Sequence, residues 1–117
     1  MQYCGTDIIE VKRVMKAIEE TDGFLEKIYS KAEIEIGNKK GDKAKSQYYA
    51  GRFAAKEAVY KAMSKATEIK SILGIEILNE DDGRPYVVID GKRIINMDVS
   101  ISHIEEYATA VAIYTGG

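Results

Sequence analysis

Four charged residues form two spaced pairs in one alanine-rich segment: Arg52 with Lys56, and Glu57 with Lys61. Each pair is spaced by four residues, so in a helix its two side chains project from nearly the same side. A carboxylate beside cations suits a magnesium and phosphate site, because Mg²⁺ usually takes one or two protein carboxylates and fills its other positions with water and phosphate oxygens. Spacing alone leaves open a solvated helix face with a weak Glu57–Lys61 ion pair.

Composition does not identify a second carboxylate for such a site. Asp7 is one candidate, but the sequence contains nineteen Asp and Glu residues. The single histidine, His103, lies where an alternating segment meets a charged turn, and it either serves the structure or contacts a phosphate or a nucleophile. One histidine and one cysteine cannot form a conventional zinc site. A serine hydrolase is equally unsupported, because no G-x-S-x-G sequence is present.

Positive charge concentrates in two places, which are Lys12, Arg13 and Lys16, and the lysines Lys39, Lys40, Lys43 and Lys45. The simplest explanation for both groups is that exposed charges keep the protein soluble. Alternatively, the lysine-rich segment could hold a terminal phosphate and the first group could meet an acidic protein. The formal net charge is −2, which argues against nonspecific coating of nucleic acid. The turn DDGRPY, residues 81–86, either only connects strands or offers a flat backbone surface to a base.

The first half of the chain predicts the helices that position these residues. A strand over 2–10 leads into a helix whose apolar residues share one face: Val11, Val14, Met15 and Ile18. Ser30 and Glu33 form a capping box that begins a short helix, which we expect to end at Gly37. Residues 37–45 predict a mobile basic loop. The longest helix is expected from about 46 to 64, and its alanines would let a sheet pack closely.

The second half predicts antiparallel strands at 75–78, 86–89, 92–95, 99–102 and 108–114, with a hairpin turn at Asp90 and Gly91. We therefore expect one α+β domain over residues 1–117, in which an antiparallel sheet packs against a long central helix and shorter N-terminal helices. No apolar stretch is long enough to span a membrane, and the first residues lack a signal-peptide pattern. A cytoplasmic protein with a reduced Cys4 is expected.

Four segments of the chain resemble one known family. They are GTDIIEVKR at 5–13, AGRFAAKEAVYKAM at 50–63, DDGRPYV at 81–87 and SISHIEEYA at 100–108. In their order and over nearly the whole chain, they are similar to the holo-acyl-carrier-protein synthases, the small 4′-phosphopantetheinyl transferases. The resemblance implies that family's fold. It also implies Mg²⁺-dependent transfer of 4′-phosphopantetheine from coenzyme A to a serine of apo acyl carrier protein, with release of adenosine 3′,5′-bisphosphate. The reaction would serve fatty acid biosynthesis.

The resemblance also assigns roles to single residues. Asp7 and Glu57 match the two acids that hold magnesium on the diphosphate, and Lys61 matches a lysine that stabilises charge on the leaving oxygens. Either Glu57 or a water held by the metal could take the serine proton. Arg13 matches an arginine that meets the acidic carrier. The residues assigned to coenzyme A are Arg52, Lys43, Lys45 and His103 for the 3′-phosphate, and Gly83, Arg84 and Pro85 for the adenine.

The family usually forms a trimer with sites at subunit contacts, so a homotrimer is expected here. The chain departs from the family pattern in two places. Ile104 stands where a threonine often follows the histidine, and residues 64–72 replace a glycine-rich turn. A noncatalytic module that binds coenzyme A or an acidic protein is therefore the alternative function.

Overall fold

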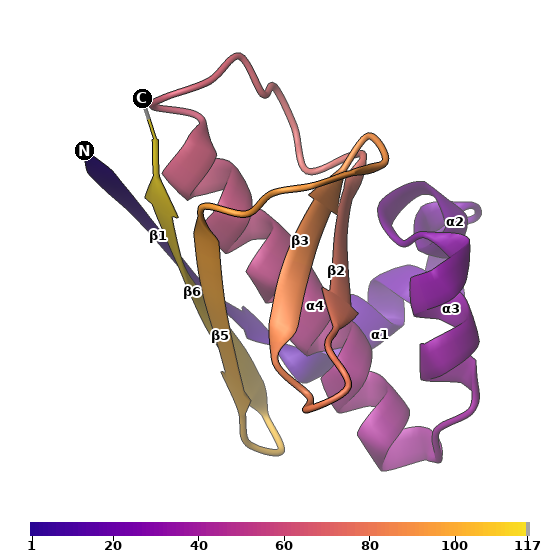
Figure 1. The fold of residues 1–117 in the computed structure, drawn as a ribbon. Coiled ribbons are helices and arrows are strands. Elements are labelled where there is room, and N and C mark those ends of the chain that lie inside the picture. Colours follow the sequence, from indigo (N-terminus) through magenta and orange to yellow (C-terminus); the bar gives the residue numbers. More distant parts are fainter. Residues whose placement is uncertain (117) are drawn as a thin grey trace.

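Two antiparallel sheets and one long helix organise the chain (Figure 1). The computed structural model describes residues 1–116. The elements are β1 (Gln2–Glu10), α1 (Val11–Glu20), α2 (Phe24–Ile28), α3 (Lys31–Asn38), α4 (Asp42–Met63), β2 (Ile75–Asn79), β3 (Pro85–Ile89), β4 (Lys92–Arg93), β5 (Met97–His103) and β6 (Tyr107–Thr115). The α+β architecture is confirmed, with the strands divided between a β1–β6–β5 sheet and a β2–β3–β4 sheet.

Helix α4 carries the main core of the protein. Its alanines at 54, 55, 58 and 62 are fully buried and belong to one apolar cluster with Ile75, Ile77 and Val87 of the second sheet and Ala110 and Ala112 of β6. Small side chains on the helix let the sheet approach closely, as the sequence indicates. Residues alternate in strand β5, and its polar residues Ser100 and Ser102 are exposed.

The N-terminal helices form a second cluster on α4. Val11 and Val14 are buried, and Met15 and Ile18 pack beside them, so the predicted apolar face of α1 is confirmed. The capping box that begins α3 is also confirmed, with Ser30 Oγ accepting from the amide of Glu33 and Glu33 Oε1 accepting from the amide of Ser30. In Figure 1, α2 and α3 lie beyond the β2–β3 hairpin, away from the β1–β6–β5 sheet.

The expected mobile loop at 37–45 is wrong at both of its ends, and only residues 39–41 lie between helices. Helix α3 continues through Gly37 to Asn38, and α4 begins at Asp42, four residues earlier than expected. Asp42 sits in the first turn of α4, where a carboxylate is favourable to the helix dipole, and the amide of Lys45 bonds Gly41 O at 2.8 Å. Residues 42–44 are exposed. A solvent-facing first turn has no apolar periodicity, which is why the sequence pattern resembled a loop.

The β2–β3 hairpin and its continuation follow the sequence closely. Ile75 pairs with Ile89 and Asn79 with Pro85. Asp90 (φ 51°) and Gly91 (φ 80°) both adopt positive φ, as a two-residue hairpin turn of the primed type requires, and β4 follows directly. Within residues 1–116, no helix combines the length and apolarity needed to cross a membrane.

Candidate functional site

The tertiary structure brings Asp7, Glu57 and Lys61 together, although fifty residues separate the two acids. Asp7 lies in β1 opposite Ala110 of β6. Lys61 lies one turn after Glu57 in α4, and its Nζ is 3.3 Å from Asp7 Oδ1 and 2.9 Å from the carbonyl oxygen of Thr6. Of the two readings that the spacing leaves open, the weak Glu57–Lys61 ion pair is not formed, and Lys61 contacts the neighbouring strand instead.

The two carboxylates are close enough to influence each other. Partial burial raises the pKa of Glu57 above its ordinary value, the negative charge of Asp7 raises it further, and the Lys61 ammonium acts in the opposite direction. A divalent cation between the carboxylates would remove their mutual repulsion. Lys61 is exposed and Glu57 only half-buried, so the site is open to a ligand.

The chemistry of these donors fits Mg²⁺. Residues 1–116 contain no group of three or more His, Cys, Asp or Glu side chains arranged to hold a metal. Mg²⁺ does not need one, because it is commonly bound by one or two carboxylates while water and phosphate oxygens complete its coordination. Asp7 and Glu57 are the residues that would hold the ion, with Lys61 adding positive charge for a phosphate.

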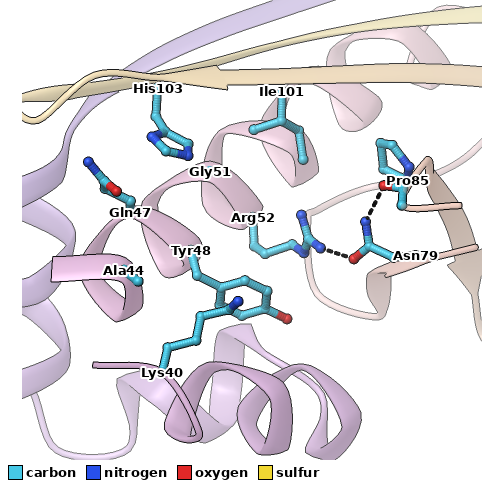
Figure 2. Close-up of a pocket in the computed structure, with 11 residues that line it drawn as sticks. Lys40, Ala44, Gln47, Tyr48, Gly51, Arg52, Asn79, Pro85, Ile101 and His103 are labelled. Carbon is cyan, nitrogen blue, oxygen red and sulfur yellow. Dashed lines mark hydrogen bonds between the residues drawn. The ribbon is translucent and has the colours of Figure 1, made fainter. Parts of the chain in front are cut away.

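A separate cavity of about 370 Å³ lies between the first half of α4, the tip of the β2–β3 hairpin and the end of β5. Figure 2 shows the side chains that line it, and those that carry polar groups are Lys40, Gln47, Tyr48, Arg52, Asn79 and His103. Gly83 and Pro85 contribute the hairpin wall. Of the residues that the family resemblance assigns to coenzyme A, four therefore line this cavity: Arg52, His103, Gly83 and Pro85.

Arg52 is the most constrained cation of the cavity, because only 8% of it is exposed. Its guanidinium lies 4.7 Å from the centroid of the Tyr48 ring and donates to Asn79 Oδ1 (Figure 2). Arg52 Nε finds no acceptor within residues 1–116, and neither does the buried hydroxyl of Tyr48. Burial raises the pKa of that hydroxyl, so it stays a neutral phenol. An unpaired guanidinium donor at a cavity wall is suited to an anion.

Other predicted residues lie outside this cavity. Lys43 is exposed, with its Nζ 4.0 Å from the Glu105 carboxylate. Lys45 lines a different cavity, beside Met15 and Ile18 of α1. Arg84 is exposed, pairs with Asp82 at 3.0 Å and lines another cavity, beside Tyr86 and Arg93.

Arg13 is exposed on α1 and contributes to neither the carboxylate cluster nor the cavity. The cavity contains three polar residues that sequence reasoning did not single out, Gln47, Tyr48 and Asn79, and one that it placed in the lysine-rich segment, Lys40. Tyr48 had a usable signal, because it precedes Arg52 by one helical turn. Asn79 had none, since its position opposite Arg52 depends on how β2 packs on α4.

The carboxylate cluster and the cavity occupy different sides of α4. Glu57 follows Arg52 by five residues, and at 3.6 residues per turn their side chains point about 140° apart. A ligand that touches both places must therefore wrap around the helix or bridge two copies of the chain.

Comparisons with known proteins show which family and which solved structures the chain resembles. A family model described as the 4′-phosphopantetheinyl transferase superfamily matches residues 3–112. Holo-[acyl-carrier-protein] synthase of Fusobacterium nucleatum is 43% identical, over 93% of this chain and 94% of that protein. The protein of the same name from Clostridium acetobutylicum is 44% identical, over 93% of each chain.

The crystal structure of a holo-(acyl-carrier-protein) synthase from Bacillus anthracis in complex with CoA (3′,5′-ADP) has the same fold. It superposes with a TM-score of 0.81 at 33% identity, covering 98% of this chain and 96% of that one. A Helicobacter pylori holo-[acyl-carrier-protein] synthase in complex with coenzyme A gives a TM-score of 0.77 at 28% identity, covering 96% of this chain and 99% of that one.

Proposed function

Since the chain belongs to the 4′-phosphopantetheinyl transferase superfamily, we propose that it transfers 4′-phosphopantetheine from coenzyme A to a serine hydroxyl of apo acyl carrier protein. The reaction depends on Mg²⁺ and releases adenosine 3′,5′-bisphosphate. One observation carries the proposal: Asp7, Glu57 and Lys61, distant in the sequence, converge at one open place between β1 and α4. We place the reaction in the cytoplasm, in fatty acid biosynthesis.

The roles of the three residues follow from their charges. Asp7 and Glu57 would hold Mg²⁺, which when bound would neutralise the diphosphate and the charge that develops on its bridging oxygen. Lys61 places an ammonium beside the same oxygens and lowers the barrier electrostatically. Glu57 is one group suited to accept the serine proton, since its carboxylate lies in the same cluster as Asp7 and Lys61. A water held by Asp7 or Glu57 is the alternative acceptor.

The cavity is proposed to bind the nucleotide end of coenzyme A. Arg52 and His103 both line it, and a guanidinium and an imidazole can donate to a 3′-phosphate. Gly83 and Pro85 offer a flat wall to the adenine. Lys43 lies near the rim, since its neighbour Ala44 lines the cavity and its partner Glu105 follows His103 by two residues. Lys45 and Arg84 remain predictions from the resemblance.

We propose that the active protein is a homotrimer in which the carboxylate cluster of one subunit meets the nucleotide cavity of another. The two places point about 140° apart on α4 within one subunit. In addition, the face of the β1–β6–β5 sheet turned away from α4 exposes apolar side chains: Ile8 is 67% exposed, Val111 37% and Ile113 39%. A patch of this kind is typical of a surface covered by a partner.

The carrier is proposed to dock on α1. Arg13 is exposed there, together with Lys12 and Lys16, and the three form a positive surface suited to an acidic helix of the carrier. No part of the carboxylate cluster depends on Arg13, so this contact would affect encounter with the carrier more than the chemical step.

Mass spectrometry tests the function directly. Apo acyl carrier protein, incubated with this protein, coenzyme A and Mg²⁺, is expected to gain the mass of one phosphopantetheine. The gain is expected to disappear on removing Mg²⁺ with a chelator and with Glu57→Gln, which keeps the side-chain shape but removes the charge that would hold the ion. Binding of coenzyme A without any transfer would instead favour the noncatalytic module, and no transfer to several carriers would overturn the proposal.

A further inference from the structure

A buried ion pair joins α3 to α4 outside both parts of the site described above. Lys56 Nζ lies 2.6 Å from Glu33 Oε1, and both side chains are fully buried. The ammonium also donates to the carbonyl oxygens of Ile28 at 3.0 Å and Ile75 at 2.5 Å. Three acceptors satisfy its three protons. Glu33 therefore does more than cap α3, the only role that its sequence spacing predicts.

Each partner of the ion pair binds one main-chain group of strand β2. Lys56 binds the carbonyl oxygen of Ile75, and Glu33 Oε2 accepts from the amide of Ile77 at 2.8 Å. One turn earlier on α4, Arg52 binds Asn79 at the other end of the strand. Helix and strand run in opposite directions here, so Lys56 anchors the beginning of β2 and Arg52 its end.

The anchored strand leads straight to the cavity wall. Asn79 Nδ2 donates to the carbonyl oxygen of Gly83 at 2.8 Å, and Gly83 and Pro85 line the cavity (Figure 2). Neither Glu33 nor Lys56 lines it. Their influence on a ligand must therefore pass through the position of the hairpin.

A contribution to folding stability does not explain why a buried ion pair is present here. Removing two charges from water is costly, and replacing a buried ion pair with apolar residues of similar size is often neutral or stabilising. What an apolar replacement cannot supply is directional bonds to the oxygen of Ile75 and the amide of Ile77. The pair therefore specifies one position of β2 on α4.

We propose that Glu33 and Lys56 are positioning residues for nucleotide binding: they fix the β2–β3 hairpin on α4 and so set the distance between its Gly83–Pro85 wall and the Arg52–His103 side of the cavity. The identity of the ligand as coenzyme A rests on the proposed function. The placement of the hairpin rests only on the contacts of the pair.

The test uses Glu33→Gln and the double variant Glu33→Gln with Lys56→Met, which leaves no unpaired buried charge and serves if the single variant does not fold. Val14→Ala is the control, because Val14 is buried in the other cluster and touches neither the hairpin nor the cavity. Two measurements are made: hydrogen exchange of the unliganded full chain, and steady-state kinetics of transfer at saturating carrier.

We expect amides of residues 75–89 to exchange faster in both test variants but not in Val14→Ala. The KM for coenzyme A is expected to rise about tenfold or more, as misplaced binding groups commonly cause, with kcat changed much less. Unchanged exchange at 75–89 in the double variant, or an unchanged KM, would overturn the inference. A wild-type protein that neither binds coenzyme A nor transfers would instead reject the proposed function, while the exchange data would still decide whether the pair places the hairpin.

Discussion

Gly5 of β1 packs directly on the backbone of Ala58 in α4. A Cβ at Gly5 would lie 2.0 Å from the carbonyl oxygen of Ala58 and 2.8 Å from the amide nitrogen of Ala62. Asp7 follows Gly5 by two residues, and Glu57 directly precedes Ala58. The closeness of this contact therefore governs how near the two carboxylates approach each other.

Gly5→Ala is expected to destabilise the protein and to lower activity in the same variant. Backbone atoms cannot move aside as a flexible side chain would, so the added methyl separates β1 from α4 at a cost of about 2–3 kcal/mol. Urea unfolding measures the stability and the mass-spectrometric assay measures transfer. Gly41→Ala is the control, because no atom lies within 4 Å of a Cβ there, and it should cost under about 1 kcal/mol. Normal stability of Gly5→Ala would contradict the close packing.

Glu57→Gln is expected to stabilise the metal-free protein at neutral pH while abolishing transfer. Burial and the charge of Asp7 raise the pKa of Glu57, with Lys61 only partly opposing them. A carboxyl whose pKa is raised on folding stabilises the protein while it is protonated, and this contribution is lost as pH rises through the folded-state pKa. At pH 7 the ionised side chain is thus unfavourable.

The gain from Glu57→Gln should be no more than about 1 kcal/mol, because the site is partly exposed. It should shrink towards zero below about pH 4, where glutamates are protonated in the unfolded chain as well. Urea unfolding in a chelator at both pH values measures it, with Glu19→Gln on the exposed side of α1 as the control. A gain that is larger in acid than at pH 7 would show that the sign is wrong.

Lys61→Ala is expected to lower kcat about a hundredfold, as the loss of one transition-state donor commonly does. The fold should persist, because Lys61 is exposed and its bonds to Asp7 and Thr6 lie at the surface. Steady-state transfer kinetics measure the effect. Lys65→Ala, which changes an exposed lysine in the turn just after α4, should retain normal kcat. Equal kinetics for the two variants would remove Lys61 from the proposed chemistry.

His103→Gln is expected to raise the KM for coenzyme A by about tenfold or more but to leave the KM for 3′-dephospho-coenzyme A nearly unchanged. The imidazole lines the cavity from the end of β5, where we place the 3′-phosphate. Loss of one charge-assisted contact to a phosphate costs about 1.5–3 kcal/mol. Ser102→Ala is the neighbouring control, since Ser102 is exposed and does not line the cavity. An equal rise in KM for both substrates would place His103 away from that phosphate.

Arg13→Glu is expected to raise the KM for acyl carrier protein by about tenfold at low salt and to leave the KM for coenzyme A unchanged. Charge reversal on an exposed helix slows encounter with an acidic partner, and salt screens the effect. Transfer rates measured over a range of salt concentrations test this. Lys27→Glu makes the same charge change on α2, another exposed position. If both variants behave alike, net charge rather than α1 determines carrier binding.

Local signals explain the parts of this protein that its sequence determines. The alternation of residues in β5, the apolar face of α1, the Ser30–Glu33 capping box and the Asp90–Gly91 turn each depend on neighbours within a few residues, and all are present in the structure. The early start of α4 gives no such local signal. Its first turn faces solvent, and a helix that packs against nothing there has no periodicity to detect.

Side-chain partners at long range were decided only by the tertiary structure. Lys56 and Lys61 look alike in the sequence, each one turn after another charged residue. The packing of α4 between two sheets places Lys56 in the interior against Glu33 and leaves Lys61 at the surface beside Asp7. Helical spacing states which side of a helix a residue occupies. What lies on that side depends on strands that follow tens of residues away, so no local pattern could supply it.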